Sequence, residues 1–261
     1  AAQLGRYLAA RYHIKLDPQH MVGHDNVPPS NTANVGLQHM DPGPLFNWQL
    51  FYQLLGANID ANGQGNPLSG KIITVAPSWQ HNKQVVTGCF PDEPTKCVTN
   101  TDPPPTSILS VHSSPVASSP LVSDLLLGPG TTDIGNEVAK VYFGQKFVVE
   151  RRQIGYNGVW YQINYDGQTG WIFSPHSHPA VFAGVGMVAT PRPGVASISV
   201  YGRAYPKASV YPAGFVGPVA SSLPYTVSQG QSYTVAQSDV LTQWYNDATI
   251  DYSEPYDHMI F

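Results

Sequence analysis

The chain has 261 residues, of which 24 are glycine and 24 are proline, and only 11% are charged. This composition excludes a coiled coil or a helical array, because both need many Glu, Lys, Ala and Leu residues and few helix breakers. The formal charge is −4 and no basic run is present, which argues against a nucleic-acid partner. No apolar stretch approaches the ~18 residues of a transmembrane helix, so we expect no transmembrane segment.

Two short helices are expected near the start of the chain. Residues 3–12 predict an amphipathic helix, because their large apolar residues share one face opposite Arg6. Those residues are Leu4, Tyr7 and Leu8. Residues 45–55 predict a second helix that begins after Pro44 and ends at Gly56. The Asn-, Gly- and Pro-rich segment that follows is expected to be a linker.

Strands are expected in the rest of the chain. The β-branched runs 72–75 and 85–87 predict short strands, and the sequence after about residue 108 has β character throughout. Asp166 and Gly167 lie between two alternating apolar runs, which predicts a tight hairpin turn.

The predicted β region contains an internal sequence repeat. Gly-Gln-Lys-Phe-Val-Val at 144–149 matches Gly-Gln-Ser-Tyr-Thr-Val at 230–235, and a Trp-Tyr pair follows each, at Trp160 and Trp244. We therefore expect two tandem β units, each of small-barrel size. The expected divisions of the chain are 1–57, a linker with short strands at 58–107, and the two units at 108–178 and 186–261.

Cys89 and Cys97 are the two cysteines of the chain. Their spacing fits a loop closed by a disulfide and no zinc-knuckle pattern. A chain with few charges and many Gly, Pro, Ser, Thr and Tyr residues is typical of exported proteins, in which disulfides persist. We expect a disulfide and a secreted or cell-wall-associated protein; the alternative is two free thiols in a cytosolic loop.

The candidate metal-binding and catalytic residues lie in two motifs that are expected to be loops. His24 follows a glycine, and His39 stands two residues before Asp41 on a Pro-Gly turn. Imidazole and carboxylate donors of this kind suit zinc. An isolated loop histidine is, however, more often a surface residue or a hydrogen-bonded core residue.

These motifs resemble a known family. Gly-His-Asp, followed by His-Met-Asp-Pro-Gly-Pro-Leu-Phe-Asn-Trp and a helix, is similar to the C-terminal part of the zinc-dependent N-acetylmuramoyl-L-alanine amidase domain. This is the type 2 amidase family, related to peptidoglycan recognition proteins. The resemblance implies that His24 and Asp41 are zinc ligands and that His39 is catalytic. A structural role in its loop is the alternative for His39.

The implied reaction is cleavage of the amide that joins the muramyl lactyl group to L-alanine. Zinc with one open coordination position lowers the pKa of bound water toward ~7 and polarises the amide carbonyl. His39 would stabilise the oxyanion or transfer a proton. Asp25, next to His24, is either a partner of that ligand or a loop-capping residue.

The same resemblance implies that part of the domain lies outside this sequence. The family takes its first zinc-binding histidine from an early strand and an acidic catalytic residue from the middle of the domain. We therefore expect a C-terminal fragment of a longer precursor, whose N-terminal piece supplies the third zinc ligand. The alternative is a degenerate domain that only binds.

The tandem units resemble bacterial SH3-like domains, the wall-binding modules of peptidoglycan hydrolases. The match rests on Gly-Gln-Lys-Phe-Val-Val, the Trp-Tyr pair and Gly-Trp-Ile, and it is weaker in the second unit, which lacks the last element. Trp160, Tyr161 and Trp171 are candidates for binding sugar rings or stem peptides. Their alternative role is to fill a small core, and the second unit could equally serve self-association.

The expected fold is thus an α+β fragment of an amidase domain, followed by a mainly β part with tandem SH3-like barrels. Two functions remain open: a secreted zinc amidase tethered to peptidoglycan by its C-terminal modules, and a non-catalytic wall-binding or structural protein.

Overall fold

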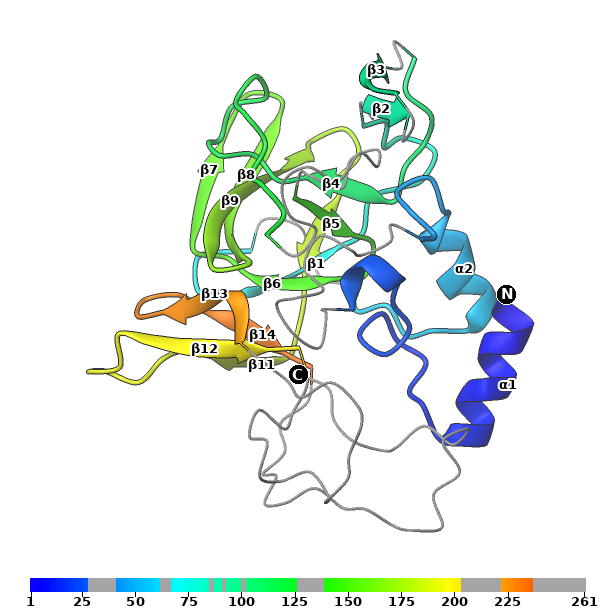
Figure 1. Cartoon of the computed structure of the whole chain (residues 1–261), viewed down its shortest axis with the longest axis horizontal. Coiled ribbons are helices and arrows are strands. Elements are labelled where there is room, and N and C mark those ends of the chain that lie inside the picture. The colour runs from blue at the N-terminus through cyan, green and yellow to red at the C-terminus, as the bar shows by residue number, and fades with distance from the viewer. Residues whose placement is uncertain are drawn as a thin grey trace.

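The structure is a computed structural model and describes residues 1–27, 41–61, 67–84, 87–90, 93–99, 102–125, 139–202 and 222–236. Helices occur only near the start of this described part, and strands make up the rest (Figure 1). The expected order of an α+β segment followed by a mainly β segment is therefore present. None of the helices described is long and apolar enough to cross a membrane.

Helix α1 (Ala2–Tyr12) confirms the first predicted helix, but its apolar face does not pack inward. The contact with the second helix runs through small residues: Ala9 is buried, and a Cβ atom added at Gly5 would lie 3.0 Å from Leu55 Cδ1. The opposite face is exposed, at Leu4 (60%), Tyr7 (58%) and Leu8 (36%). Helix α1 is therefore oriented with its small residues toward α2, and its larger apolar side chains face solvent.

Helix α2 (Trp48–Leu55) begins three residues later than expected. The Asn47 side chain accepts a hydrogen bond of 2.9 Å from the Leu50 amide and so caps the first turn, which fixes the start of the helix there. The helix ends, as predicted, at Gly56, whose φ of +76° is the left-handed conformation that favours glycine.

The strands are short, and their bounds are as follows. They are β1 (Ile72–Val75), β2 (Thr87–Phe90), β3 (Glu93–Thr99), β4 (Ile108–Ser110), β5 (Lys140–Tyr142), β6 (Lys146–Val148), β7 (Arg151–Ile154), β8 (Gly158–Tyr165), β9 (Gln168–Pro175), β10 (Val181–Ala183), β11 (Met187–Ala189), β12 (Ser197–Tyr201), β13 (Ser222–Ser228) and β14 (Tyr233–Val235).

These strands form several small antiparallel sheets. Two of them have three strands, in the orders β10-β1-β6 and β7-β8-β9. Strand β1 confirms the strand predicted at 72–75, and it is the central strand of its sheet, with Ile73 opposite Phe147 on one side and Ala183 on the other. Within the described ranges no sheet closes into a barrel, so the structure supports the mainly β layout but not closed barrels.

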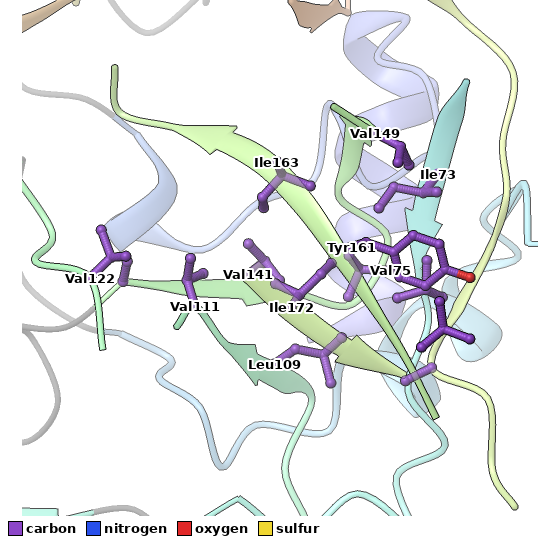
Figure 2. Packing of buried hydrophobic residues seen from close by; sticks show 14 residues of the cluster. Ile73, Val75, Leu109, Val111, Val122, Val141, Val149, Tyr161, Ile163 and Ile172 are labelled. Carbon is purple, nitrogen blue, oxygen red and sulfur yellow. The ribbon is translucent and has the colours of Figure 1, made fainter. Parts of the chain in front are cut away.

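One apolar core joins several of these sheets, but among the described residues it includes none of β11, β12, β13 or β14. It includes residues from β1, β4, β5, β8 and β9, and Figure 2 shows several of their side chains converging between the strands. Ile73, Val141, Ile163 and Ile172 are all fully buried there. A second cluster, around Trp48 and its aromatic neighbours, packs α2 against the β part. The helical segment and the strands are therefore held together by direct packing.

The predicted hairpin at Asp166 and Gly167 is confirmed. Strands β8 and β9 pair from Gly158 opposite Pro175 to Tyr165 opposite Gln168, which leaves a two-residue turn. Its two central residues have φ values of +47° and +73°. Positive φ at both positions is the type I′ pattern, whose twist matches that of the flanking strands.

The repeat at 230–235 contributes β14, which pairs with β11, while β12 pairs with β13. These strands lie against the first unit: Thr234 Oγ1 donates to the Lys146 carbonyl oxygen (2.8 Å), and the Gly167 amide donates to the Tyr233 hydroxyl (3.2 Å). The Trp-Tyr pair at Trp244 lies outside the residues described.

Candidate functional site

The backbone brings together His24 and Asp41, the two residues expected to bind zinc. His24 begins a short 3-10 helix, His24–Asn26, directly after Gly23. Its amide donates a hydrogen bond of 2.9 Å to the Asp41 carbonyl oxygen. The ends of the loop between them are thereby fixed against each other, although the two residues are far apart in sequence.

Their side chains also meet. The His24 Nδ1 atom lies 3.5 Å from Asp41 Oδ2, and the side chains are 50% and 68% exposed. Both donor atoms therefore lie at an accessible surface. His39 falls outside the described residues, as does the side chain of Asp25, so their roles remain predictions.

The separation of the two donor atoms suits a shared zinc ion. Zinc bonds of about 2.0–2.2 Å at a tetrahedral angle place two ligand atoms about 3.4 Å apart. The observed 3.5 Å is close to that value and longer than a good hydrogen bond between nitrogen and oxygen. Two donors do not complete a site, and the described part of the chain contains no group of three or more His, Cys, Asp or Glu residues placed to hold a metal.

The segment that carries His24 is anchored on both sides. The Tyr52 hydroxyl of α2 donates to the Met21 carbonyl oxygen (2.6 Å), and the Gln19 side chain donates to the Gly144 carbonyl oxygen (3.1 Å). Burial, and secondarily the charge of Asp17, raises the pKa of Tyr52, so this hydroxyl stays a donor. The candidate site therefore sits on a segment held by both the helices and the strands.

His20 has a role that the sequence did not indicate. Its Nδ1 atom lies 2.6 Å from Asp17 Oδ1, which also accepts hydrogen bonds from the Gln19 and His20 amides. Only 11% of the His20 side chain is exposed. This histidine thus fixes the turn that leads to His24, and the spacing of Asp17 and His20 was the available signal.

The three residues proposed for wall binding differ in their surroundings. Trp160 lines a pocket of about 470 Å³, together with Phe173 and His112. The ring centroids of these two neighbours lie 4.9 and 5.2 Å from that of Trp160. All three side chains are largely buried: Trp160 is 7% exposed, Trp171 is 6% exposed, and Tyr161 is 1% exposed and belongs to the central core. Trp160 differs from Tyr161 in that it also lines this pocket.

The Trp160 pocket is lined by neutral polar groups and by a cation. Burial lowers the pKa of His112, while a hydrogen bond with Ser119 acts in the opposite direction. Asn82, Gln84 and Ser110 are neutral and polar, and Lys83 also lines the pocket, with its ammonium group 3.3 Å from Asp102 Oδ1. Aromatic faces beside hydrogen-bonding groups suit sugar or peptide ligands.

The two cysteines face each other across a strand pair. Cys89 in β2 is the direct register partner of Cys97 in β3. Directly opposite residues of an antiparallel pair have Cα atoms about 4.5–5.5 Å apart, which lies within the range that a disulfide spans. The side chains are outside the described part of the chain, so the disulfide stays a prediction.

Comparison with models of known protein families, with curated proteins and with solved structures finds no match for this chain.

Proposed function

We propose that this chain is the C-terminal part of a secreted, zinc-dependent peptidoglycan amidase, which cleaves the amide between N-acetylmuramic acid and L-alanine. The observation that carries the proposal is the approach of His24 Nδ1 to within 3.5 Å of Asp41 Oδ2. The motif resemblance names these same two residues as ligands, and their separation is close to that of two ligands on one tetrahedral ion.

In the proposed reaction the residues of this chain have the following roles. His24 and Asp41 hold the metal through one nitrogen and one oxygen, at a surface that substrate can reach. His39, two residues before Asp41, donates a hydrogen bond or a proton where negative charge develops on the amide oxygen. When bound, zinc supplies hydroxide near neutral pH and polarises the carbonyl.

The test uses the native protein, with any preceding chain retained, and two measurements. Zinc content is determined after dialysis, and release of peptides with a new N-terminal alanine is followed on purified peptidoglycan. His24→Ala and Asp41→Asn should lower both, while His178→Ala, which removes an exposed histidine outside the site, should lower neither. A zinc-free wild-type protein, or a zinc-loaded one that releases no such peptides, would contradict the proposal.

The pocket beside Trp160 supports a second function, binding to the cell wall without catalysis. Its volume of about 470 Å³ lies within the usual range of small-molecule sites. The SH3-like character of the two units belongs to this proposal, and the mainly β layout of the described residues is consistent with it. In this account His24 and Asp41 form only an ion pair.

Co-sedimentation with purified peptidoglycan tests the binding function. Trp160→Ala should reduce the bound fraction, whereas Tyr156→Ala should not, because Tyr156 is 98% exposed and lies outside the pocket. The thermal unfolding midpoint of both variants should be measured, because reduced binding by an unfolded variant would say nothing about the pocket. Gln84→Ala, which trims the same pocket at a partly exposed residue, is a milder second variant. Wild-type levels of binding in both pocket variants would exclude this pocket as the wall site.

A further inference from the structure

A second pocket, distinct from the Trp160 pocket, lies where the two β units meet. It has a volume of about 390 Å³, and its walls come from β5, β6 and the β8–β9 turn and from β12, β13 and β14, with Asn26 of the short helix after Gly23 also lining it. Its size is within the range of small-molecule sites, roughly 300–1,000 Å³. We call it the inter-unit pocket.

Two carboxylates give the inter-unit pocket an acidic character. Asp124 is 6% exposed and accepts a hydrogen bond of 3.0 Å from the Tyr165 hydroxyl. Asp166 comes from the hairpin turn on the same side. Lys140, also buried, is the only cationic side chain among the described residues that line the pocket, so carboxylates outnumber cations there.

Asp166 suits the turn that contains it, but the turn does not require a carboxylate. A type I′ turn is equally well served by Asn or Gly at this position, and such turns normally lie in water. Here the second unit covers the turn: a Cβ atom added at Gly167 would lie 2.8 Å from the Thr226 carbonyl oxygen. As a result Asp166 Oδ2 is buried and, within the described part of the chain, has no hydrogen-bond partner.

An unpaired buried carboxylate oxygen is costly, so its environment resists ionisation. Burial, together with the charge of Asp124, raises the pKa of Asp166 to about 8, and a hydrogen bond from the Leu125 amide only partly opposes this. A cation bound in the pocket beside the two carboxyl groups would favour the ionised form of Asp166, because it supplies an opposite charge.

Tyrosine rings form much of the remaining wall. Tyr165, Tyr225 and Tyr233 line the pocket, and burial raises the pKa of all three, with the negative charge of Asp166 adding to the effect. They therefore stay neutral at physiological pH. Neutral tyrosine rings next to carboxylates are the surroundings that bind ammonium groups in proteins, through cation–π attraction.

The apolar residues suit the rest of such a ligand. Val200 and Val227 line the pocket between the tyrosines, where an alkyl stem can be buried. A metal ion fits less well, since it would need several oxygen or nitrogen ligands and the described residues contain no group of three or more such side chains.

We propose that the inter-unit pocket binds an alkylammonium group, that is, a primary amine on a short aliphatic stem, with Asp166 and Asp124 holding the charge and the tyrosine rings enclosing it. This inference does not depend on the zinc site or on wall binding.

The experiment is an NMR titration of the full chain with n-butylammonium chloride. The expected result is saturable binding that shifts the signals of Gly167 and Tyr233, with no such binding by 1-butanol, which has the same stem without the charge. Asp166→Asn keeps the turn and should weaken binding about tenfold to a hundredfold, the loss typical of a hydrogen bond to a charged group. Asp102→Asn, at an exposed carboxylate outside the pocket, should leave binding unchanged.

Affinity should also depend on pH. The ionisable side chains that line the pocket are Asp124, Lys140, Tyr142, Tyr165, Tyr225 and Tyr233, besides Asp166 itself. A pKa of about 8 for Asp166 predicts that affinity rises about tenfold from pH 7 to pH 9, while the amine stays charged. This rise should vanish in Asp166→Asn.

A second variant separates binding from folding. Tyr225→Phe keeps the ring and should retain most of the affinity, whereas Tyr225→Leu should lose it. Equal binding of 1-butanol and n-butylammonium, competition by calcium chloride at matched ionic strength, or unchanged affinity in Asp166→Asn would each overturn the proposal.

Discussion

Replacing Asp166 with asparagine exchanges one carboxylate oxygen for an amide nitrogen, while the turn, the volume and the backbone conformation are retained. Its expected effect is on the pH dependence of stability. The Asp166 carboxyl has a pKa of about 8 in the folded protein against an ordinary value of 3.8, chiefly because of burial. Between these two values the folded protein binds a proton that the unfolded chain has released.

The sign follows from this difference. Because the unfolded chain binds fewer protons, the free energy of unfolding falls as pH rises from about 4 to 8 and levels off above the folded pKa. The slope from this one group is about −1.4 kcal/mol per pH unit, so Asp166 alone lowers stability by about 2 kcal/mol between pH 6 and pH 8. Asp166→Asn removes that loss.

The assay is urea unfolding of both proteins at pH 6 and pH 8. The free energy of unfolding of the wild type should fall by about 2 kcal/mol more than that of Asp166→Asn over this interval. Asp102→Asn, at an exposed carboxylate, should retain the wild-type pH dependence. If the free energy of unfolding changes with pH by the same amount in the wild type and in Asp166→Asn, this carboxylate is not buried against the second unit, and the prediction is wrong.

Three further predictions concern the fold. Gly170→Ala should lower the free energy of unfolding by about 1–3 kcal/mol, because the new Cβ atom would lie 2.2 Å from Val111 Cγ1. Urea unfolding measures this change, and an unchanged unfolding midpoint would contradict the close packing of Gly170 against Val111. Asn47→Ala removes the side-chain cap of α2 and should cost about 1 kcal/mol, whereas Asn47→Asp should restore most of it. The intact mass of the native protein should rise by the mass of two hydrogen atoms on reduction, and an unchanged mass would show free thiols. Cys89→Ser should lower the free energy of unfolding by about 2–3 kcal/mol, because the disulfide to Cys97 is lost.

Local signals in the sequence predicted the elements whose cause is local. The hairpin at Asp166 and Gly167 follows from turn chemistry, and the end of α2 follows from Gly56, so both could be placed without knowing the rest of the fold. Helix α2 begins later than the position of Pro44 predicts, because the Asn47 side chain caps its first turn.

Features that depend on distant contacts could not be predicted. The inward face of α1 is its small-residue face, since Gly5 must approach Leu55, and a periodic apolar pattern alone cannot show this. The β-branched run at 72–75 predicted strand β1, but its central place in the sheet depends on partners more than seventy residues away in β6 and beyond. The burial of Asp166 likewise arises only when the second unit covers its turn.

For the candidate site, the proximity of two residues is observed, and their metal-binding role stays a prediction. The motifs named His24 and Asp41, and the structure brings their side chains together, which spacing alone could not have established. The same reasoning grouped Trp160 with Tyr161, although they are neighbours on one strand and face opposite ways: one lines a pocket and the other fills the core. Alternation along β8 explains that difference.

The most direct test of the zinc site is a crystal structure of the zinc-soaked protein, with any preceding chain retained and with anomalous data collected at the zinc edge. We expect an anomalous peak within bonding distance of both His24 Nδ1 and Asp41 Oδ2, which disappears in crystals of Asp41→Asn. A zinc-soaked crystal with no peak at these two atoms, or with the same peak in the variant, would contradict it.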